Sequence, residues 1–516
     1  MAPAGSGKTT TVVARLAWRV ALGVTPRAIC ALTFNRRAAE ELQQRADEAL
    51  GELGLEAGSV RVSTFHALGR AILAESGRNV EHIVERQEVL AMLAAGPLPG
   101  SSLRWLDDAF TRLKLDPERG PPTEDVATHR AFADYQDWLA ERSAIDLDDL
   151  VALAVPALRA DARLLDGWRA RASVLFVDEA QDLDRAQLDL AVLLAGEKRD
   201  IFLVGDDDQT IYAWRLADVR RVLGLATRLP GLRRVDLETN HRCAPEIVHR
   251  AARLVAYNRE RFSKRIRASP SASGSVTLVP DSGDDVARAR WALMEWAQPA
   301  SSGQSASFAQ PMSPRSSGRR AVLARTNREL APYAAVALEL GVPISVEADG
   351  LLLDEPGLLE TIDLAAARMA AHEPVLPVLP ALAAAAQERD LDAELSAALL
   401  GWAAPFHDLA ALRSEVVKRV TARRTAADPA AALTLATIHG TKGLEWDHVL
   451  CVGHDDGAFP SGRALREAVD PSRALEEERR LAYVAWTRAR KTLTVVYDPG
   501  APSQFLLEAF DAGELP

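Results

Sequence analysis

Cysteine is scarce in this sequence of 516 residues. Its three cysteines, Cys30, Cys243 and Cys451, lie far apart, and none of them belongs to a Cys-x-x-Cys pair. This spacing argues against a disulfide framework and against a cysteine-bound zinc site. The reducing cytoplasm is the compartment that such cysteine usage fits best.

Long hydrophobic runs and an excess of positive charge are also missing. No apolar run approaches the ~18 residues that span a bilayer, and the N-terminus turns polar and glycine-rich at Gly5, unlike a signal peptide. Asp and Glu number 72 against 61 Lys and Arg, which gives a net charge of -11. Membrane insertion and histone-like binding are therefore excluded, and any nucleic-acid site must be a local cleft.

The remaining composition, 48% hydrophobic and 26% charged, is that of a folded protein whose length allows about three or four domains. Short apolar, β-branched runs predict nine buried strands, at residues 28–33, 60–63, 174–177, 201–204, 276–279, 321–324, 433–436, 448–452 and 493–497. Amphipathic stretches lie between many of these runs. Strands that alternate with helices indicate α/β domains with parallel sheets.

Two longer stretches, at about 72–150 and 358–432, lack this strand rhythm and are predicted to be helical insertions. A basic run follows residue 258. We interpret it as a solvated surface face and not as a phosphate track, and it consists of Arg259, Arg261, Lys264, Arg265 and Arg267.

Residues 2–9 read Ala-Pro-Ala-Gly-Ser-Gly-Lys-Thr and run directly into a helical pattern. This is the phosphate-binding loop, with alanine in place of the leading glycine. Gly5 and Gly7 let backbone N–H groups turn toward phosphates, Lys8 reaches the β- and γ-phosphate oxygens, and the Thr9 hydroxyl can hold Mg²⁺. A chance glycine-rich turn is the structural alternative.

The third predicted strand ends in Asp178 and Glu179, which places two carboxylates at the C-terminal edge of a sheet, where α/β proteins bind ligands. Asp178 suits Mg²⁺, and Glu179 suits a general base that polarises the attacking water. An acidic cluster at a helix start is the alternative. The next predicted strand leads into Gln209, placed to sense a γ-phosphate, and Trp214, which could stack on a base or belong to the core.

The chain contains a series of motifs that resemble, in type and in order, those of superfamily 1 DNA helicases of the UvrD/Rep/PcrA type. They occupy residues 2–9, 33–42, 64–66, 178–181, 205–215, 240–242, 437–445 and 478–489. The resemblance implies two RecA-like motor domains of the P-loop NTPase class, with ATP between them and single-stranded DNA across their tops. The first motor domain is expected at 1–75 and 145–235 with a helical insertion at 76–144, and the second at 236–357 and 433–516 with a reduced helical insertion at 358–432.

The resemblance also implies a role for individual residues. ATP binding is expected at Ala4, Gly5, Ser6, Gly7, Lys8, Thr9, Thr10 and Glu445; catalysis at Glu179, Gln209, Arg242 and Arg488; Mg²⁺ binding at Thr9 and Asp178; and DNA binding at Phe34, Asn35, Thr64, Phe65, His66, Trp214 and His439. Arg242 and Arg488 would stabilise charge on the γ-phosphoryl oxygens. Stacking on aromatic rings would tolerate any base sequence. Core packing for Phe65 and a capping or packing role for His439 stay open.

The implied activity is that of an ATP-dependent DNA helicase and translocase that moves 3′ to 5′, with ATP and Mg²⁺ as cofactors and single-stranded and partly duplex DNA as partners. The alternative is a truncated or non-unwinding, ATP-gated DNA-binding or remodelling subunit. The chain departs from the family at His241, where the family often has a tyrosine packed against the adenine. The strand and glutamine motif that precede the family's phosphate loop have no counterpart, so the biological chain is expected to start upstream of Met1.

Overall fold

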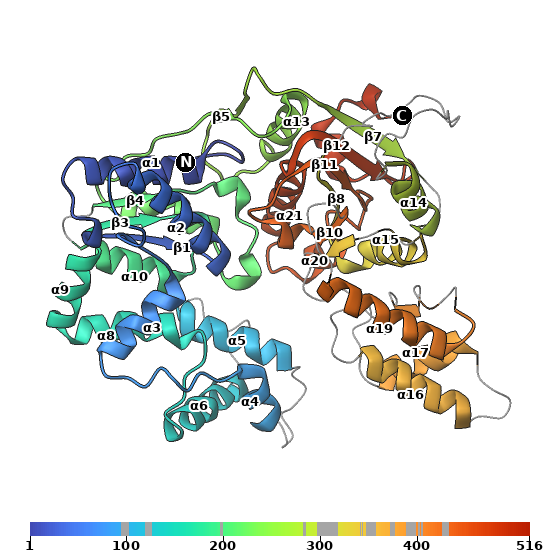
Figure 1. The fold of residues 1–516 in the computed structure, drawn as a ribbon, viewed down its shortest axis with the longest axis horizontal. Coiled ribbons are helices and arrows are strands. Elements are labelled where there is room, and N and C mark those ends of the chain that lie inside the picture. Colours follow the sequence, from blue (N-terminus) through green and yellow to red (C-terminus); the bar gives the residue numbers. More distant parts are fainter. Residues whose placement is uncertain are drawn as a thin grey trace. The chain divides into compact units, whose positions relative to one another are not determined.

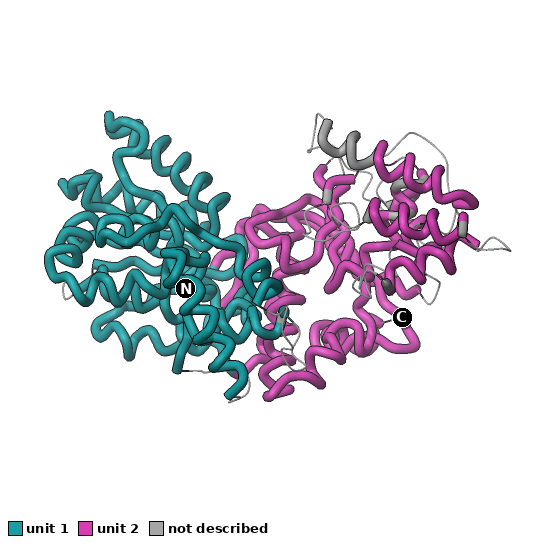
Figure 2. The backbone as a smooth tube through the Cα atoms, turned by 90° about the horizontal axis from the view of Figure 1, so that it is seen from below, with its two compact units in different colours: residues 1–238, 260–264 teal, residues 239–259, 265–516 magenta. Residues whose placement is uncertain are grey.

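Two parallel β-sheets form the cores of two units (Figure 1, Figure 2). Unit 1 contains residues 1–238 and 260–264, and unit 2 contains residues 239–259 and 265–516. The computed structural model describes residues 1–93, 103–118, 126–196, 200–281, 285–296, 318–340, 342, 344–346, 358–371, 377–388, 399–400, 403, 406–425 and 433–515.

The sheet of unit 1 has four parallel strands in the order β2-β1-β3-β4. They are β1 (Ile29–Thr33), β2 (Arg61–Thr64), β3 (Val174–Val177) and β4 (Ile201–Leu203). Side chains alternate along β1, so Ile29 and Ala31 join one hydrophobic cluster while Cys30 and Leu32 join another. Both sets are buried because helices cover both faces of this parallel sheet.

One face of the sheet packs against α1 (Lys8–Ala21) and α2 (Arg36–Gly51), through side chains that include Leu16 and Leu42. The other face packs against α3 (Phe65–Glu75), α7 (Asp149–Ala152), α8 (Ala154–Ala160), α9 (Ala162–Arg171) and α10 (Arg185–Ala195). Unit 1 also contains the short helices α11 (Val219–Leu223) and α12 (Leu225–Arg228).

A further group of helices in unit 1 has a hydrophobic cluster of its own. The group consists of α4 (Arg86–Leu93), α5 (Leu103–Leu115) and α6 (Val126–Glu141). Leu90, Phe110 and Tyr135, one from each helix, are buried together. Figure 1 shows these helices beside one another and apart from the sheet of unit 1.

The sheet of unit 2 has six parallel strands in the order β7-β12-β11-β8-β10-β9. They are β7 (Ser275–Pro280), β8 (Arg320–Ala324), β9 (Ile344–Val346), β10 (Leu433–Thr437), β11 (Trp446–Cys451) and β12 (Ala489–Tyr497). Helices α14 (Asp285–Trp291) and α15 (Asn327–Leu340) share a hydrophobic cluster with β8 and β10. Helices α13 (Pro245–Val255) and α21 (Pro471–Trp486) contact β12.

Unit 2 also has a helical group with a separate cluster, built from α16 (Leu358–Ala371), α17 (Val378–Glu388) and α19 (Leu409–Thr425). Ile362, Leu382 and Leu412 are fully buried in this cluster. Unit 2 also contains β5 (Thr239–Asn240), which pairs with β6 (Arg267–Ala268), and the helices α20 (Gly462–Glu467) and α22 (Gln504–Ala509).

The predicted α/β fold class with parallel sheets is confirmed. Each of the nine predicted runs overlaps a strand. The two-residue strands β5 and β6 are too short to show a periodicity, and β9 was not predicted either. The boundaries drawn between motor domains and insertions stay predictions. None of the helices in the described part of the chain combines the length and hydrophobicity that a bilayer span needs.

Gly69 tests how tightly α3 packs in unit 1. An alanine there would place its Cβ 2.0 Å from the carbonyl oxygen of Leu150 in α7. We expect Gly69→Ala to lower the free energy of unfolding by about 1–3 kcal/mol, as overpacking does. Gly51→Ala, at the end of α2 with no atom within 4 Å of the new Cβ, is the control and should be neutral or slightly stabilising. Urea denaturation compares the two variants, and equal unfolding free energies would contradict the packing argument.

Candidate functional site

The phosphate loop of unit 1 leads into α1 and turns on two glycines with left-handed backbone. Gly5 has φ 65°, and Gly7, the residue before α1, has φ 84°. Other residues rarely adopt this region, and no atom lies within 3.9 Å of a Cβ built at Gly7, so its conformation and not its space requires glycine. Lys8 and Thr9 occupy the first turn of α1, whose N–H groups can bind phosphate.

Hydrogen bonds hold the rest of this loop. Ala4 and Ser6 are buried, and the Ser6 hydroxyl donates to the Pro3 carbonyl at 2.7 Å, whereas Thr10 is exposed. The backbone N–H of Ala2 donates to the carbonyl of Gly205 at 2.9 Å. The phosphate loop is therefore tied to the loop that follows β4.

Asp178 and Glu179 follow β3, at the same edge of the sheet. Asp178 is 7% exposed, and its backbone N–H donates to the Leu32 carbonyl at 2.9 Å. Glu179 has φ 51° and ψ 43°, a left-handed conformation that costs a residue other than glycine about 1–3 kcal/mol. Its Oε2 lies 4.0 Å from Lys8 Nζ. The structure thus brings together the phosphate-loop lysine and the predicted general base.

The donor set at Thr9 and Asp178 fits Mg²⁺. A hydroxyl and a carboxylate are oxygen ligands that Mg²⁺ accepts, with waters and nucleotide phosphates in its other positions. Among the described residues, no group of three or more His, Cys, Asp or Glu side chains forms a metal site by itself. These residues therefore suit an ion that arrives with a nucleotide better than a resident metal.

Two side chains that sequence reasoning missed connect Glu179 with Gln209. Gln181 Nε2 donates to Glu179 Oε2 at 2.6 Å, and Gln181 Oε1 accepts from the backbone N–H of Asp206 at 2.9 Å. Asp206 Oδ2 then accepts from Gln209 Nε2 at 2.7 Å. A Cβ at Gly205 would lie 2.6 Å from Gln181 Oε1, which explains the glycine beside this network. Gln181 and Asp206 both lie within sequence motifs, at 178–181 and 205–215, and this position could have marked them as site residues.

In unit 2, the predicted residues Arg242 and Glu445 meet as an ion pair. Arg242 Nε lies against Glu445 Oε2 without hydrogen-bond geometry, and Arg490 approaches the other carboxylate oxygen at 3.5 Å. Asn240 Oδ1 accepts from the backbone N–H groups of Arg242 and Cys243, both at 2.8 Å, and so fixes this turn.

Arg488 lies in the same unit but is only 2% exposed. Its guanidinium donates to backbone carbonyls, from Nε to Val484 at 3.0 Å and from Nη1 to Leu444 at 3.2 Å. Arg242, with a side chain that is 18% exposed, is the more accessible of the two predicted phosphate-stabilising arginines.

Aromatic rings line up beside the sheet of unit 1. Phe34, directly after β1, stacks on Tyr212 with ring centres 5.1 Å apart and planes inclined by 14°. Tyr212 meets Trp214 edge to face at 6.1 Å, and Trp214 is 59% exposed. Tyr212 was not predicted as a site residue, although its place two residues before Trp214 was a usable signal. The exposed ring of Trp214 can stack on a base.

The other predicted DNA-binding residues of unit 1 differ in burial and in the contacts that they make. Asn35 caps α2 by accepting from Ala38 N–H at 2.8 Å, and Thr64 caps α3. His66 is partly buried, and this burial lowers its pKa. Phe65 is 1% exposed within the core, which favours the core-packing alternative, and its contact with DNA stays a prediction. The first residue of α3 faces inward because it shares a helix face with buried residues three and seven positions later.

His439 of unit 2 lies in the short 3-10 turn that follows β10. Burial, with a contribution from Arg325, lowers the pKa of His439 to about 4. The ring is therefore neutral near pH 7, so any contact with DNA would use hydrogen bonding or stacking and not its charge.

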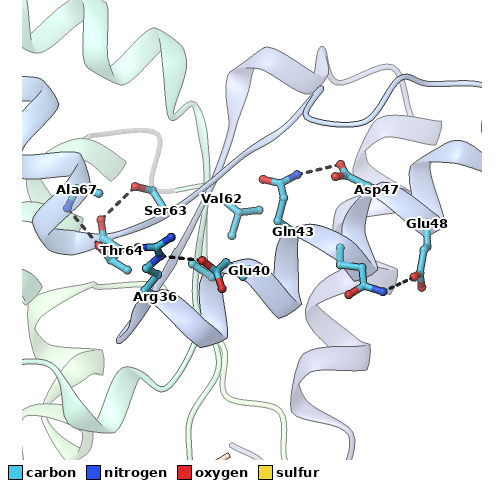
Figure 3. A pocket seen from close by; sticks show the side chains of 11 residues that line it. Arg36, Glu40, Gln43, Asp47, Glu48, Val62, Ser63, Thr64 and Ala67 are labelled. Carbon is cyan, nitrogen blue, oxygen red and sulfur yellow. Dashed lines mark hydrogen bonds and ion pairs between the residues drawn. The ribbon is translucent and has the colours of Figure 1, made fainter. Parts of the chain in front are cut away.

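A surface cavity of about 770 Å³ lies between α2 and the β2–α3 segment (Figure 3). Thr64 lines it, but none of the predicted ATP-binding residues does. Three carboxylates, on Glu40, Asp47 and Glu48, also line the cavity, and intrahelical hydrogen bonds hold Asp47 and Glu48. Arg36 also lines the cavity and pairs with Glu40 at 2.7 Å, so carboxylates outnumber cations in this lining, which disfavours a phosphate backbone there.

Comparisons with known proteins match both units. The family model of the UvrD/REP helicase N-terminal domain matches residues 1–230, and that of the UvrD-like helicase C-terminal domain matches residues 409–499. The chain is 28% identical over 570 residues to ATP-dependent DNA helicase UvrD2 of Mycobacterium tuberculosis (strain ATCC 25618 / H37Rv), which covers 98% of this chain and 78% of the relative. It is 31% identical over 284 residues to ATP-dependent DNA helicase Rep of Escherichia coli (strain K12), which covers 52% of this chain and 42% of Rep.

Proposed function

Because the chain belongs to the UvrD/Rep family of superfamily 1 helicases and is an ATP-dependent DNA helicase, we propose that it moves 3′ to 5′ along single-stranded DNA. The observation that supports ATP-driven movement is the site in unit 1, where Lys8 lies 4.0 Å from Glu179 and where Gln181 and Asp206 join Glu179 to Gln209. The 3′ to 5′ direction is what the resemblance to the family implies. A phosphate-binding lysine, a base and a γ-phosphate sensor are the parts that transfer of a phosphoryl group to water uses.

In the proposed reaction, the N–H groups of the phosphate loop and Lys8 hold the β- and γ-phosphates of ATP. Thr9 and Asp178 would hold Mg²⁺, which would neutralise phosphate charge when bound. Glu179 accepts a proton from the attacking water, and Gln209 orients that water beside the γ-phosphate. The link between Glu179 and Gln209 supports their action as one unit.

Unit 2 is proposed to contribute Arg242 and Arg488 to the charge on the transferred phosphoryl group and Glu445 to the ribose. Arg242 is better placed to meet a phosphate because its side chain is partly exposed, whereas backbone carbonyls surround Arg488. Residues of both units are then required for turnover.

The proposed DNA track in unit 1 uses the rings of Phe34, Tyr212 and Trp214, with Asn35, Thr64 and His66 nearby in the sequence motifs. Stacked rings bind any base through its face, at about 1–3 kcal/mol per base. His439 is the proposed contact from unit 2. Such a track tolerates all sequences, as a motor that moves along DNA requires.

A non-unwinding, ATP-gated DNA-binding subunit is the second candidate, because the stretch at 358–432 is short for a regulatory insertion. Single-turnover assays on duplexes with a 3′ or a 5′ single-stranded tail separate the candidates. The helicase proposal requires strand separation of the 3′-tailed duplex alone. Hydrolysis and tail binding without strand separation would favour the second candidate.

The ATP site is tested by paired substitutions. We expect Lys8→Ala to weaken ATP binding, whereas Glu179→Gln should bind ATP and DNA but lose turnover by about 10²–10⁴-fold, as removal of a general base does. Lys418→Ala, which removes a 72% exposed lysine of α19, is the control. Fluorescent-nucleotide titration and steady-state ATPase assays give the two quantities. Wild-type turnover in Glu179→Gln would remove this residue from the mechanism.

The DNA track is tested at Trp214. We expect Trp214→Ala to reduce the stimulation of ATPase by single-stranded oligonucleotides more than the basal rate, because an exposed stacking surface is lost. Trp18→Ala removes a 46% exposed tryptophan of α1 and should leave the stimulation unchanged. If the two variants are stimulated equally, Trp214 does not contact DNA during the cycle.

A further inference from the structure

The basic run between residues 259 and 267 is not one solvated face. Arg259, Arg265 and Arg267 are exposed, as interpreted from the sequence. The side chains of Lys264 and Arg261, however, are only 1% and 14% exposed. The solvated-face interpretation is therefore wrong for these two, and both turn toward the loop that follows β4.

The ammonium group of Lys264 lies among three consecutive carboxylates of that loop. It pairs with Asp206 Oδ1, with Asp207 Oδ1 at 2.6 Å and with Asp208 Oδ2 at 3.0 Å. All three aspartate side chains are 0% exposed. The backbone N–H of Phe262 also donates to Asp207 Oδ2 at 2.7 Å. Three carboxylates this close together repel one another out of water, so a buried cation is needed to hold the loop in this shape.

Asp206 is the member of this cluster that reaches the proposed catalytic residues. Its Oδ1 pairs with Lys264, its Oδ2 accepts from Gln209, and its backbone N–H donates to Gln181, which holds Glu179. We propose that Lys264 is a positioning residue for ATP hydrolysis, which fixes Asp206 so that Gln209 and Glu179 keep the geometry needed for water attack. This inference rests on the proposed function.

Arg261 provides an internal contrast. Its guanidinium pairs in bidentate geometry with Asp208, with distances of 2.9 and 2.7 Å, whereas Lys264 pairs with Asp206 directly. Burial would raise the pKa of Asp208, but Lys264 and Arg261 outweigh burial and lower it to about 2. Arg261 thus shares the charge-balancing role of Lys264, but its ion pair is with Asp208, whose backbone N–H donates to Asp206 Oδ1 at 3.3 Å.

The test compares Lys264→Met with Arg261→Gln, since each variant removes one cation from the same cluster. Steady-state ATPase rates are measured with saturating single-stranded oligonucleotide. We expect Lys264→Met to lower kcat about 10–100-fold, as misplacement of catalytic groups does, with KM for ATP changed by less than about 3-fold. Arg261→Gln should lower the melting temperature while kcat stays within about 3-fold of wild type.

A double-mutant cycle with Gln209→Ala tests the route. If Lys264 acts through Gln209, the kcat losses of Lys264→Met and Gln209→Ala should not multiply in the double variant. Should Lys264→Met fail to fold, Lys264→Met/Asp207→Asn restores the cluster's net charge and still removes the cation from Asp206. Equal kcat losses in the Lys264 and Arg261 variants, or full multiplication in the cycle, would overturn the inference. Absence of turnover in the wild type would instead overturn the proposed function, and this inference with it.

Discussion

Parallel pairing of β1, β3 and β4 is the constraint on which the site of unit 1 depends. The carboxyl ends of parallel strands meet at one edge of a sheet, so Phe34, Glu179 and Asp206 come together although their positions in the chain span more than 170 residues. Two backbone hydrogen bonds then hold the loops at this edge: Asp178 donates to the carbonyl of Leu32 in β1, and Ala2 of the phosphate loop donates to the carbonyl of Gly205. The strand order of the sheet therefore determines which loops lie next to one another.

This edge collects carboxylates, and two lysines compensate them in different ways. Lys8 has a side chain that is 12% exposed and lies 4.0 Å from Glu179, so it can still meet a phosphate. Lys264 is 1% exposed and lies among Asp206, Asp207 and Asp208. The ammonium group of Lys8 is therefore available to a ligand, whereas that of Lys264 is held in a buried cluster of ion pairs. The difference in burial separates the two roles.

The sequence allowed the sheets and the main motifs to be predicted because apolar, β-branched runs mark buried strands whatever their partners are. It did not reveal partnerships across long separations, such as Gln181 with Asp206 or Lys264 with the same aspartate, since spacing alone does not say which loops meet. The core-packing alternative for Phe65 has a signal in the sequence, because Leu68 and Ile72 continue its buried face at helical spacing.

The buried ion pairs of Lys264 also attach the segment 260–264 to unit 1. Residues 260–264 lie in unit 1, while the chain on either side of them lies in unit 2. Separating a buried charged pair costs about 3–5 kcal/mol, so these five residues stay with the loop after β4 through ordinary fluctuations. The chain passes from one unit to the other at 238–239, 259–260 and 264–265. Two of these three crossing points, at 259–260 and 264–265, flank the segment that contains Lys264. The salt bridges of Lys264 therefore lie close in sequence to these crossing points and contact the proposed catalytic network through Asp206.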